Sequence, residues 1–303
     1  MQGGKLKLKP DSKIIVQGIT EPLGSISTQR MIASGTNVVA GVSPGEGGQM
    51  LHDIPIFDLV EQALEAVGPV DTTISFVQPY WALDAALEAI AAGIRQIILI
   101  TAGIPPLDMV RLLRTAEATD TLIVGPASSG IIVPGKILLG TQESEFYTPG
   151  NVGLISHAGT LTYEIAWELT QAGLGQSMSV SLGRDAIVGS CFRQWLKILD
   201  KDESTKAIVL VGQQCPEATE EATAEYIATA IDKPVVAYFA GRHAPADKRL
   251  GDAHTIIARH LSIPVADAGT AGRQIAAFKQ AKIPVAKRPS QIPELVKKAL
   301  KKG

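Results

Sequence analysis

Three observations predict an α/β fold with two doubly wound domains for this chain of 303 residues. Short, almost continuous apolar runs recur along the sequence, and Ala- and Leu-rich segments with helical spacing separate them. Strands that are apolar on both faces are typical of parallel sheets covered by helices on each side. The alternation pauses once, in the turn-rich stretch 135–150, which we interpret as the connector between two domains. We therefore expect a Rossmann-like domain over residues 1–145 and a second doubly wound domain over residues 146–303.

The first domain begins with a lysine-containing arm and an apolar strand over residues 13–17. A turn with two glycines, a helix over 25–34 and a strand over 37–42 complete a βαβ unit. Further strands are expected at 72–77, 96–100 and 121–124, with helices at 81–92 and 107–118. A parallel sheet with its helices on both faces follows from this order.

The same rhythm predicts the second domain. Its expected strands are 152–156, 177–181, 207–211, 234–239 and 263–266. Its expected helices are 161–172, 192–200, 217–231, 272–280 and a lysine-rich terminal helix over 291–302.

Composition excludes several classes of protein. Hydrophobic residues make up 46% of the chain. The formal net charge is only -2, so the overall electrostatic field does not favour binding to nucleic acid or to an anionic membrane. Cys191 and Cys215 lack the spacing of metal ligands, and we expect no metal. No leader and no apolar run of spanning length are visible, so we expect a cytoplasmic protein.

The segment 248–257 carries the most informative group of polar residues. It reads Lys-Arg-Leu-Gly-Asp-Ala-His-Thr-Ile-Ile and follows the expected strand 234–239 after a short loop. Open α/β sheets place their chemistry in loops beyond the carboxyl ends of strands. We therefore expect functional residues here.

Several framework motifs resemble those of one known family. They are Gln-Gly-Ile-Thr from Gln17, Ser-Pro-Gly-Glu-Gly-Gly from Ser43, Ser-His-Ala-Gly-Thr-Leu-Thr-Tyr-Glu from Ser156, and the segment 248–257. Over nearly its whole length the chain is similar to the α subunit of succinyl-CoA synthetase. The resemblance implies a CoA-binding-type Rossmann-like domain, followed by a flavodoxin-like domain that carries a phosphohistidine. In that family a β subunit of the ATP-grasp type supplies the nucleotide site.

The residues that carry the family's phosphoryl chemistry differ in this chain. The nucleophilic His falls on Asp252, and the nearby His254 would project about 200° away around a helix start. The Glu that orients the His falls on Gln213, which cannot balance an imidazolium. A Ser that donates to the phosphate falls on Ala158, beside Gly159 and Thr160 at the start of a helix, where backbone N–H groups suit an anion.

Three further positions depart from the family. Ala102 and Ala127 stand where it has Glu and Asn. His157 stands where it often has Arg, and is interpreted either as an anion-binding residue or as a polar surface histidine.

The CoA-type loops of the first domain also depart from the family. Gly18, Thr20 and Pro44 are retained, whereas Glu21, Pro22 and Leu23 replace small or polar residues. Pro22 removes an N–H donor, and Glu46 replaces a Lys that pairs with a CoA phosphate. We therefore expect this chain to bind CoA weakly or not at all.

Three hypotheses follow for function. The first is a non-catalytic relative, a pseudoenzyme that is a structural or regulatory partner of a β-type subunit or of a second copy of itself. The second is an active NDP-forming acyl-CoA synthetase α subunit with a phospho-acceptor site rebuilt on His254 or Asp252. The third is a sensor of a nucleotide or a small anion.

Overall fold

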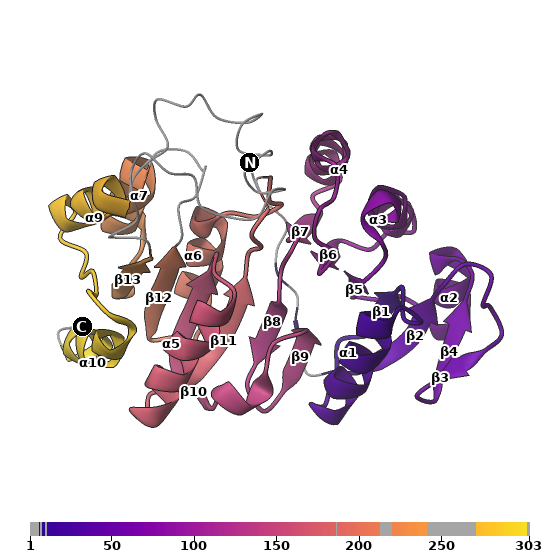
Figure 1. The fold of residues 1–303 in the computed structure, drawn as a ribbon, viewed down its shortest axis with the longest axis horizontal. Helices are drawn as coiled ribbons and strands as arrows, with labels where there is room; N and C mark the ends of the chain where they lie inside the picture. The colour runs from indigo at the N-terminus through magenta and orange to yellow at the C-terminus, as the bar shows by residue number, and fades with distance from the viewer. Residues whose placement is uncertain are drawn as a thin grey trace. The chain divides into compact units, whose positions relative to one another are not determined.

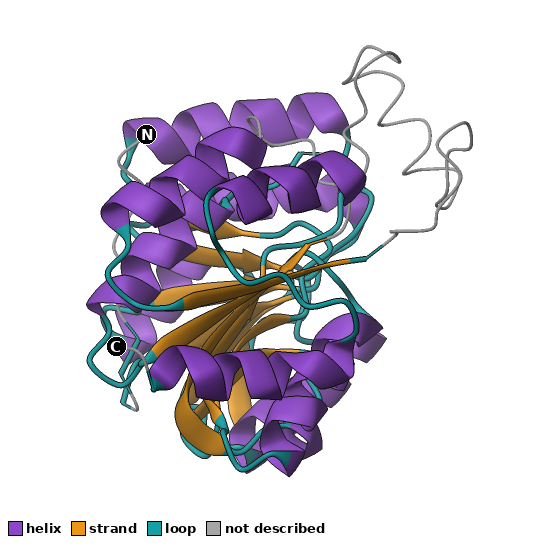
Figure 2. Ribbon diagram, turned by 90° about the vertical axis from the view of Figure 1, so that its left-hand side faces the viewer, coloured by secondary structure: helices purple, strands orange, loops and turns teal. Residues whose placement is uncertain are grey.

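The computed structural model describes residue 6 and residues 8–9, 11–185, 187–212, 220–240 and 271–301. These residues form two compact units. The first contains the described residues up to Ser144 together with Ile187–Ser190, and the second contains the others. Each unit is a sheet with helices on both faces, as Figure 2 shows for the second unit. The predicted fold class is confirmed.

The first unit is built on a seven-stranded sheet. Its strands, in spatial order, are β3 (Met50–Leu51), β4 (Ile54–Phe57), β2 (Val38–Val42), β1 (Ile14–Gln17), β5 (Thr72–Ser75), β6 (Gln96–Leu99) and β7 (Leu122–Val124). Every neighbouring pair is parallel except β3 with β4. The chain proceeds outward from β1 to β2 and β4, then returns to the other side of β1. This reversal creates a switch point at the carboxyl ends of β1 and β5, where ligands bind in such folds.

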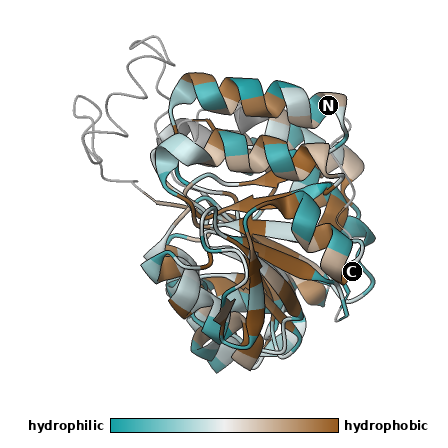
Figure 3. Ribbon diagram, turned by 90° about the vertical axis from the view of Figure 1, so that its right-hand side faces the viewer, coloured by the Kyte–Doolittle hydropathy of each residue, from teal (hydrophilic) through white to brown (hydrophobic). Residues whose placement is uncertain are grey.

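Helices cover both faces of this sheet. Figure 1 shows α1 (Pro22–Ala33) on one face and α2 (Val60–Val67), α3 (Ala82–Ala91) and α4 (Pro106–Ala118) on the other. Buried alanines such as Ala63 and Ala86 let these helices approach β-branched and leucine side chains of the strands. In Figure 3 the strands are accordingly brown, whereas the helices alternate between brown inner and teal outer positions.

Two parts of the first unit were not predicted. Strands β3 and β4 and helix α2 lie in a stretch for which the sequence predicts no element; β3 and β4 are only two and four residues long, so they carry little pattern. The expected connector at 135–150 is wrong in part, since β8 (Gly130–Val133) and β9 (Ile137–Gly140) form an antiparallel hairpin. Two hydrogen bonds connect Thr36, just beyond α1, to β9. The Thr36 hydroxyl donates to Leu138 O (2.7 Å) and accepts from Leu138 N (3.0 Å).

The second unit contains four parallel strands in the order β13 (Val235–Phe239), β12 (Ala207–Gly212), β10 (Pro149–Ser156) and β11 (Gln176–Ser181). On one face α5 (Thr160–Gln171) packs against α10 (Ile292–Leu300), and on the other α6 (Phe192–Lys201), α7 (Glu220–Ala230) and α9 (Ala271–Gln280) form a row (Figure 1). The short η1 (Pro79–Trp81), η2 (Ser144–Phe146) and η4 (Pro289–Gln291) precede α3, β10 and α10. The expected strand at 263–266 lies outside the described residues.

Candidate functional site

The first candidate region is the turn that joins β1 to α1. Gly18 has φ +74°, and a Cβ built on Gly24 would lie only 2.1 Å from the carbonyl oxygen of Gly18. Glycine at both positions therefore allows the backbone to fold back tightly before α1 begins. The N–H of Gly18 donates to Val42 O of the neighbouring strand at 2.8 Å, which holds the turn at the switch point.

Helix α1 begins with few groups for binding an anion. Glu21 is the N-cap residue and Pro22 is the first helical residue, so the first N–H group of the helix is missing. Only the N–H groups of Leu23 and Gly24 remain before regular helical bonding starts with Ser25 N donating to Glu21 O at 2.8 Å. Glu21 is half-buried at the N-cap and makes no side-chain bond to the helix start, and its negative charge opposes a second one there.

The second Gly-rich loop follows β2 and lies beside the first. A hydrogen bond of 2.8 Å between the hydroxyls of Thr20 and Ser43 joins the two loops. Pro44 is exposed and Glu46 is half-buried. The structure thus brings Gly18, Thr20, Glu21, Leu23, Pro44 and Glu46 together at the carboxyl edge of the first sheet.

Three residues at this edge were missed by sequence reasoning. Asp58 accepts hydrogen bonds from the backbone of the second loop, and Tyr80 and Trp81 in η1 are 82% and 65% exposed just beyond β5. The sequence signal available for this edge was the adjacent aromatic pair Tyr80 and Trp81, a few residues after β5. Asp58 offered no signal of its own, since its partners lie 13 and 11 residues away in sequence.

Ala102 and Ala127 lie beyond β6 and β7. Ala102 is exposed, whereas Ala127 is buried and has φ +53°. An alanine in this left-handed conformation is strained by about 1 kcal/mol. The backbone N–H of Ala127 donates to Thr101 O at 2.8 Å. Because both residues are alanines, neither position supplies a polar side chain.

The second candidate region is the start of α5, after β10. The hydroxyl of Ser156 lies 2.6 Å from that of Thr162 and accepts from Ala158 N at 2.9 Å. The methyl group of Ala158 is fully buried, Gly159 is the N-cap residue and Thr160 begins the helix. The guanidinium of Arg184 lies close to Gly159, 3.4 Å from a Cβ built there. This helix start keeps its backbone N–H groups but has no hydroxyl at position 158.

His157 is neither an exposed residue nor a cation, so the expectation of a polar surface histidine is wrong. It is only 5% exposed, and its ring packs edge-on against Phe192 with 4.7 Å between ring centroids. Its Nδ1 lies 3.1 Å from Gly183 O, so Nδ1 carries the proton of the neutral ring. Burial lowers the pKa of His157 to about 4, against a smaller opposing effect of the Gly183 carbonyl. A neutral imidazole supplies no positive charge for an anion.

Three predicted site residues lie outside the described residues: Asp252, His254 and Gln213. Their roles remain predictions. Across the described ranges, we found no cluster of three or more His, Cys, Asp or Glu side chains able to hold a metal ion. In that same part of the chain, no helix combines the length and the apolar character needed to cross a bilayer.

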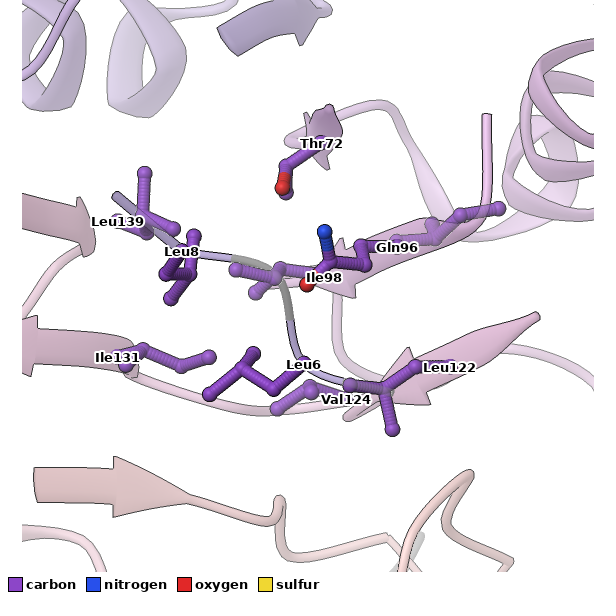
Figure 4. Close-up of a pocket in the computed structure, with 10 residues that line it drawn as sticks. Leu6, Leu8, Thr72, Gln96, Ile98, Leu122, Val124, Ile131 and Leu139 are labelled. Atoms are coloured by element: carbon purple, nitrogen blue, oxygen red, sulfur yellow. The ribbon is translucent and has the colours of Figure 1, made fainter. Parts of the chain in front are cut away.

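A small pocket lies away from both candidate regions. Figure 4 shows it under Leu6 and Leu8 of the N-terminal arm, against Thr72, Gln96 and Leu122. These last three residues lie at the amino-terminal ends of β5, β6 and β7, opposite the edge that carries the Gly-rich loops. Its lining is mainly aliphatic, so it is a packing gap beneath the arm.

Two family models match the chain in the order of the two units. A CoA binding domain matches residues 9–103, and a succinyl-CoA ligase like flavodoxin domain matches residues 149–291. An ADP-forming succinate–CoA ligase α subunit from Archaeoglobus fulgidus is 41% identical over 289 residues, which cover 95% of this chain and 97% of that relative. The chain belongs to the succinate–CoA ligase α-subunit family.

Other members of this family and its fold relatives are also similar. The malate–CoA ligase α subunit of Methylorubrum extorquens is 43% identical over 248 residues, 80% of this chain and 83% of that relative. A solved structure of ATP citrate lyase from Methanothrix soehngenii matches with a TM-score of 0.84 at 22% identity. The match covers 98% of this chain and 51% of that one, and at this identity it shows a shared fold.

Proposed function

We propose that this chain is a non-catalytic succinate–CoA ligase α-type subunit, a structural or regulatory partner of a β-type subunit or of a second copy. The observation that carries the proposal is the buried methyl group of Ala158 at the start of α5. A phosphoryl group held there would lack the hydroxyl donor that the family resemblance implies. The neighbouring hydroxyl of Ser156 is already bonded to Thr162 and Ala158.

Sequence changes outside the described residues support the same proposal. Asp252 replaces the imidazole nucleophile with a carboxylate, which repels a phosphate dianion. Gln213 removes the carboxylate that would hold a histidine in its nucleophilic tautomer. Together these changes remove the nucleophile, its orienting group and one side-chain donor to the phosphate.

Weak CoA binding is part of the proposal. Glu21 and Glu46 put negative charge on the two Gly-rich loops, and Pro22 removes an amide donor from α1. The retained tight turn at Gly18 supports a site of CoA type, whose affinity is weakened by the added negative charge and by the missing amide donor.

The test is phosphorylation by labelled ATP in the presence of a β-type subunit from an active relative. We expect no acid-labile phosphate on this chain, while the relative's own α subunit labels fully as the positive control. Co-purification with the β-type subunit, or a dimer by light scattering, should accompany the negative result. A label that disappears in His254→Ala would establish the active alternative instead.

A further inference from the structure

The carboxyl-terminal end of the chain is strongly basic. Residues 271–303 contain nine Lys and Arg residues and one acidic residue, Glu294, which gives this segment a net charge of +8. Since the whole chain has a net charge of -2, the residues before this segment carry a net charge of -10. The small overall charge therefore conceals two oppositely charged parts of one chain.

In the second unit this segment forms an exposed border beyond β13, the outermost strand of the sheet (Figure 1). Ala237 in β13 donates its N–H to Pro284 O at 2.9 Å and accepts from Ala286 N at 2.8 Å, so residues 284–286 lie alongside the strand. Ile292 and Val296 of α10 are fully buried, which turns the opposite face of this helix outward. The lysine border is defined by six exposed side chains: Lys279, Lys282, Lys287, Lys297, Lys298 and Lys301.

Most of this positive charge has no counterpart nearby. Within the described part of the chain, Lys298 is the only one of the six lysines that pairs with a carboxylate, that of Glu294 at 2.6 Å. Lys297 and Lys301 are like charges four residues apart on α10, a spacing at which they repel each other and destabilise the helix. A partner that brings carboxylates to the lysine border would offset this repulsion.

The first unit carries a complementary surface on α2 and α3. These two helices contain four carboxylates and no Lys or Arg. Glu61 and Glu65 are exposed and four residues apart on α2, and Asp84 and Glu88 repeat this spacing on α3. The N–H of Val60 donates to Oε1 of Glu88 at 2.9 Å and so joins the two helices. We call the surface formed by the four carboxylates the acidic face.

The chemistry of the lysine border favours an acidic protein surface over other anions. Phe278 is the one aromatic residue of the segment 271–303, and it is buried, so the border has no ring on which a nucleic acid base could stack. Ile292 and Val296 pack inside the unit, so α10 lacks the outward apolar face of a membrane-surface helix. An acidic surface of protein is available on the chain itself.

We propose that the lysine border of one copy of this chain binds the acidic face of a second copy. The contact is heterologous, because it joins two different surfaces, and it depends on charge rather than on apolar burial. This inference deepens the proposed function and rests on it only in taking a second copy as the partner.

The test begins with the mass of the wild-type chain in solution, measured by sedimentation over a range of protein concentrations. We expect the mass to rise with protein concentration at about 50 mM NaCl and to return toward that of a monomer at about 500 mM, where exposed charges are screened.

Two charge reversals then separate the two surfaces. Lys297→Glu with Lys301→Glu reverses the lysine border, and Glu61→Lys with Glu65→Lys reverses the acidic face. Each double variant should raise the dissociation constant of self-association at least about tenfold, because attraction becomes repulsion. An equal mixture of the two variants should assemble again, since each supplies the surface that the other has lost.

Lys197→Glu with Lys201→Glu is the matched control. Both lysines are exposed and four residues apart on α6, so the variant makes the same charge change at the same spacing but away from α10. It should assemble as the wild type does. An equal loss of association in this control would overturn the proposal, because net charge alone would then explain the effect.

Two other results would also overturn the proposal. The first is a wild-type chain that stays monomeric at the lower salt concentration. The second is an association that only one of the two reversals weakens, since that surface would then have a different partner. Neither measurement involves phosphoryl transfer, so a failure here is distinct from the appearance of phosphoenzyme, which would overturn the proposed function.

Discussion

The Gly-rich loops of the first unit and the start of α5 in the second differ from an anion-binding site in opposite ways. The loops keep their tight backbone but have gained negative charge, from Glu21 and Glu46. The start of α5 has gained no carboxylate, and Arg184 lies close to it, but it has an alanine methyl and a neutral buried histidine. The comparison teaches that the first region is altered by added charge and by one lost amide donor, at Pro22, and the second by missing side-chain groups. Charge changes should strengthen binding at the first region, whereas the second needs several groups at once.

The largest expected effect tests the second region. Asp252→His alone should give almost no phosphoenzyme with a β-type subunit of an active relative, because the orienting carboxylate and one phosphate donor are still missing. Each missing preorganised donor costs roughly two to three decades in rate. The triple change Asp252→His, Gln213→Glu, Ala158→Ser should recover measurable acid-labile label. The same triple background with Asn at position 252 is the control and should stay unlabelled; full labelling of the single variant would contradict the comparison.

The tight turn of the first region should be intolerant of a side chain. In Gly24→Ala the new Cβ would meet the Gly18 carbonyl oxygen at 2.1 Å, and both groups belong to backbone that cannot rotate away. We expect the free energy of unfolding to fall by about 3 kcal/mol, measured by urea denaturation. Gly45→Ala is the matched control: its φ is +85° but its Cβ would meet open space, so about 1 kcal/mol should be lost. An equal loss of unfolding free energy in the two variants would contradict the close contact between residue 24 and the Gly18 carbonyl oxygen.

His157 should make stability depend on pH. Its folded pKa of about 4 lies below the ordinary value of 6.5, so between these values the unfolded chain binds the proton and the folded chain does not. The free energy of unfolding should therefore fall as pH drops from about 6.5 to about 4, by up to ~3 kcal/mol, and this contribution is constant above pH 6.5. His157→Gln should flatten the dependence in urea titrations at pH 7, 6 and 5. An unchanged slope in the variant would assign the dependence to other groups.

The smallest effect concerns the charge on the loops. Glu46→Lys should strengthen CoA binding about tenfold at low salt, equivalent to about 1.4 kcal/mol, because it exchanges repulsion for attraction. Glu65→Lys makes the same charge change on the exposed side of α2 and should leave CoA affinity nearly unchanged. The gain should shrink in 1 M salt, where screening is strong. If Glu65→Lys is equally effective, only the net charge of the protein matters.

The long parallel strands and their helices could be predicted from the sequence, because apolar runs such as that of β12 are buried on both faces. The hairpin of β8 and β9 could not, since turn-rich composition around Gly130 and Gly135 conceals two short buried strands. In the candidate site, the Gly-rich loops followed from motif and spacing. The bonds of Asp58 and the burial of His157 did not, because both depend on packing between segments distant in sequence.

The short segment Ile187–Ser190 has a consequence for how the polypeptide is made. It is assigned to the first unit, where Gly189 N donates to Gly125 O at 2.7 Å and Ile187 packs against the core, although the residues on either side belong to the second. A fragment that stops at residue 145 would lack these contacts and expose the surface beneath them. During synthesis, the first unit acquires its last native contacts only after residue 190 has emerged from the ribosome, when part of the second unit is already present.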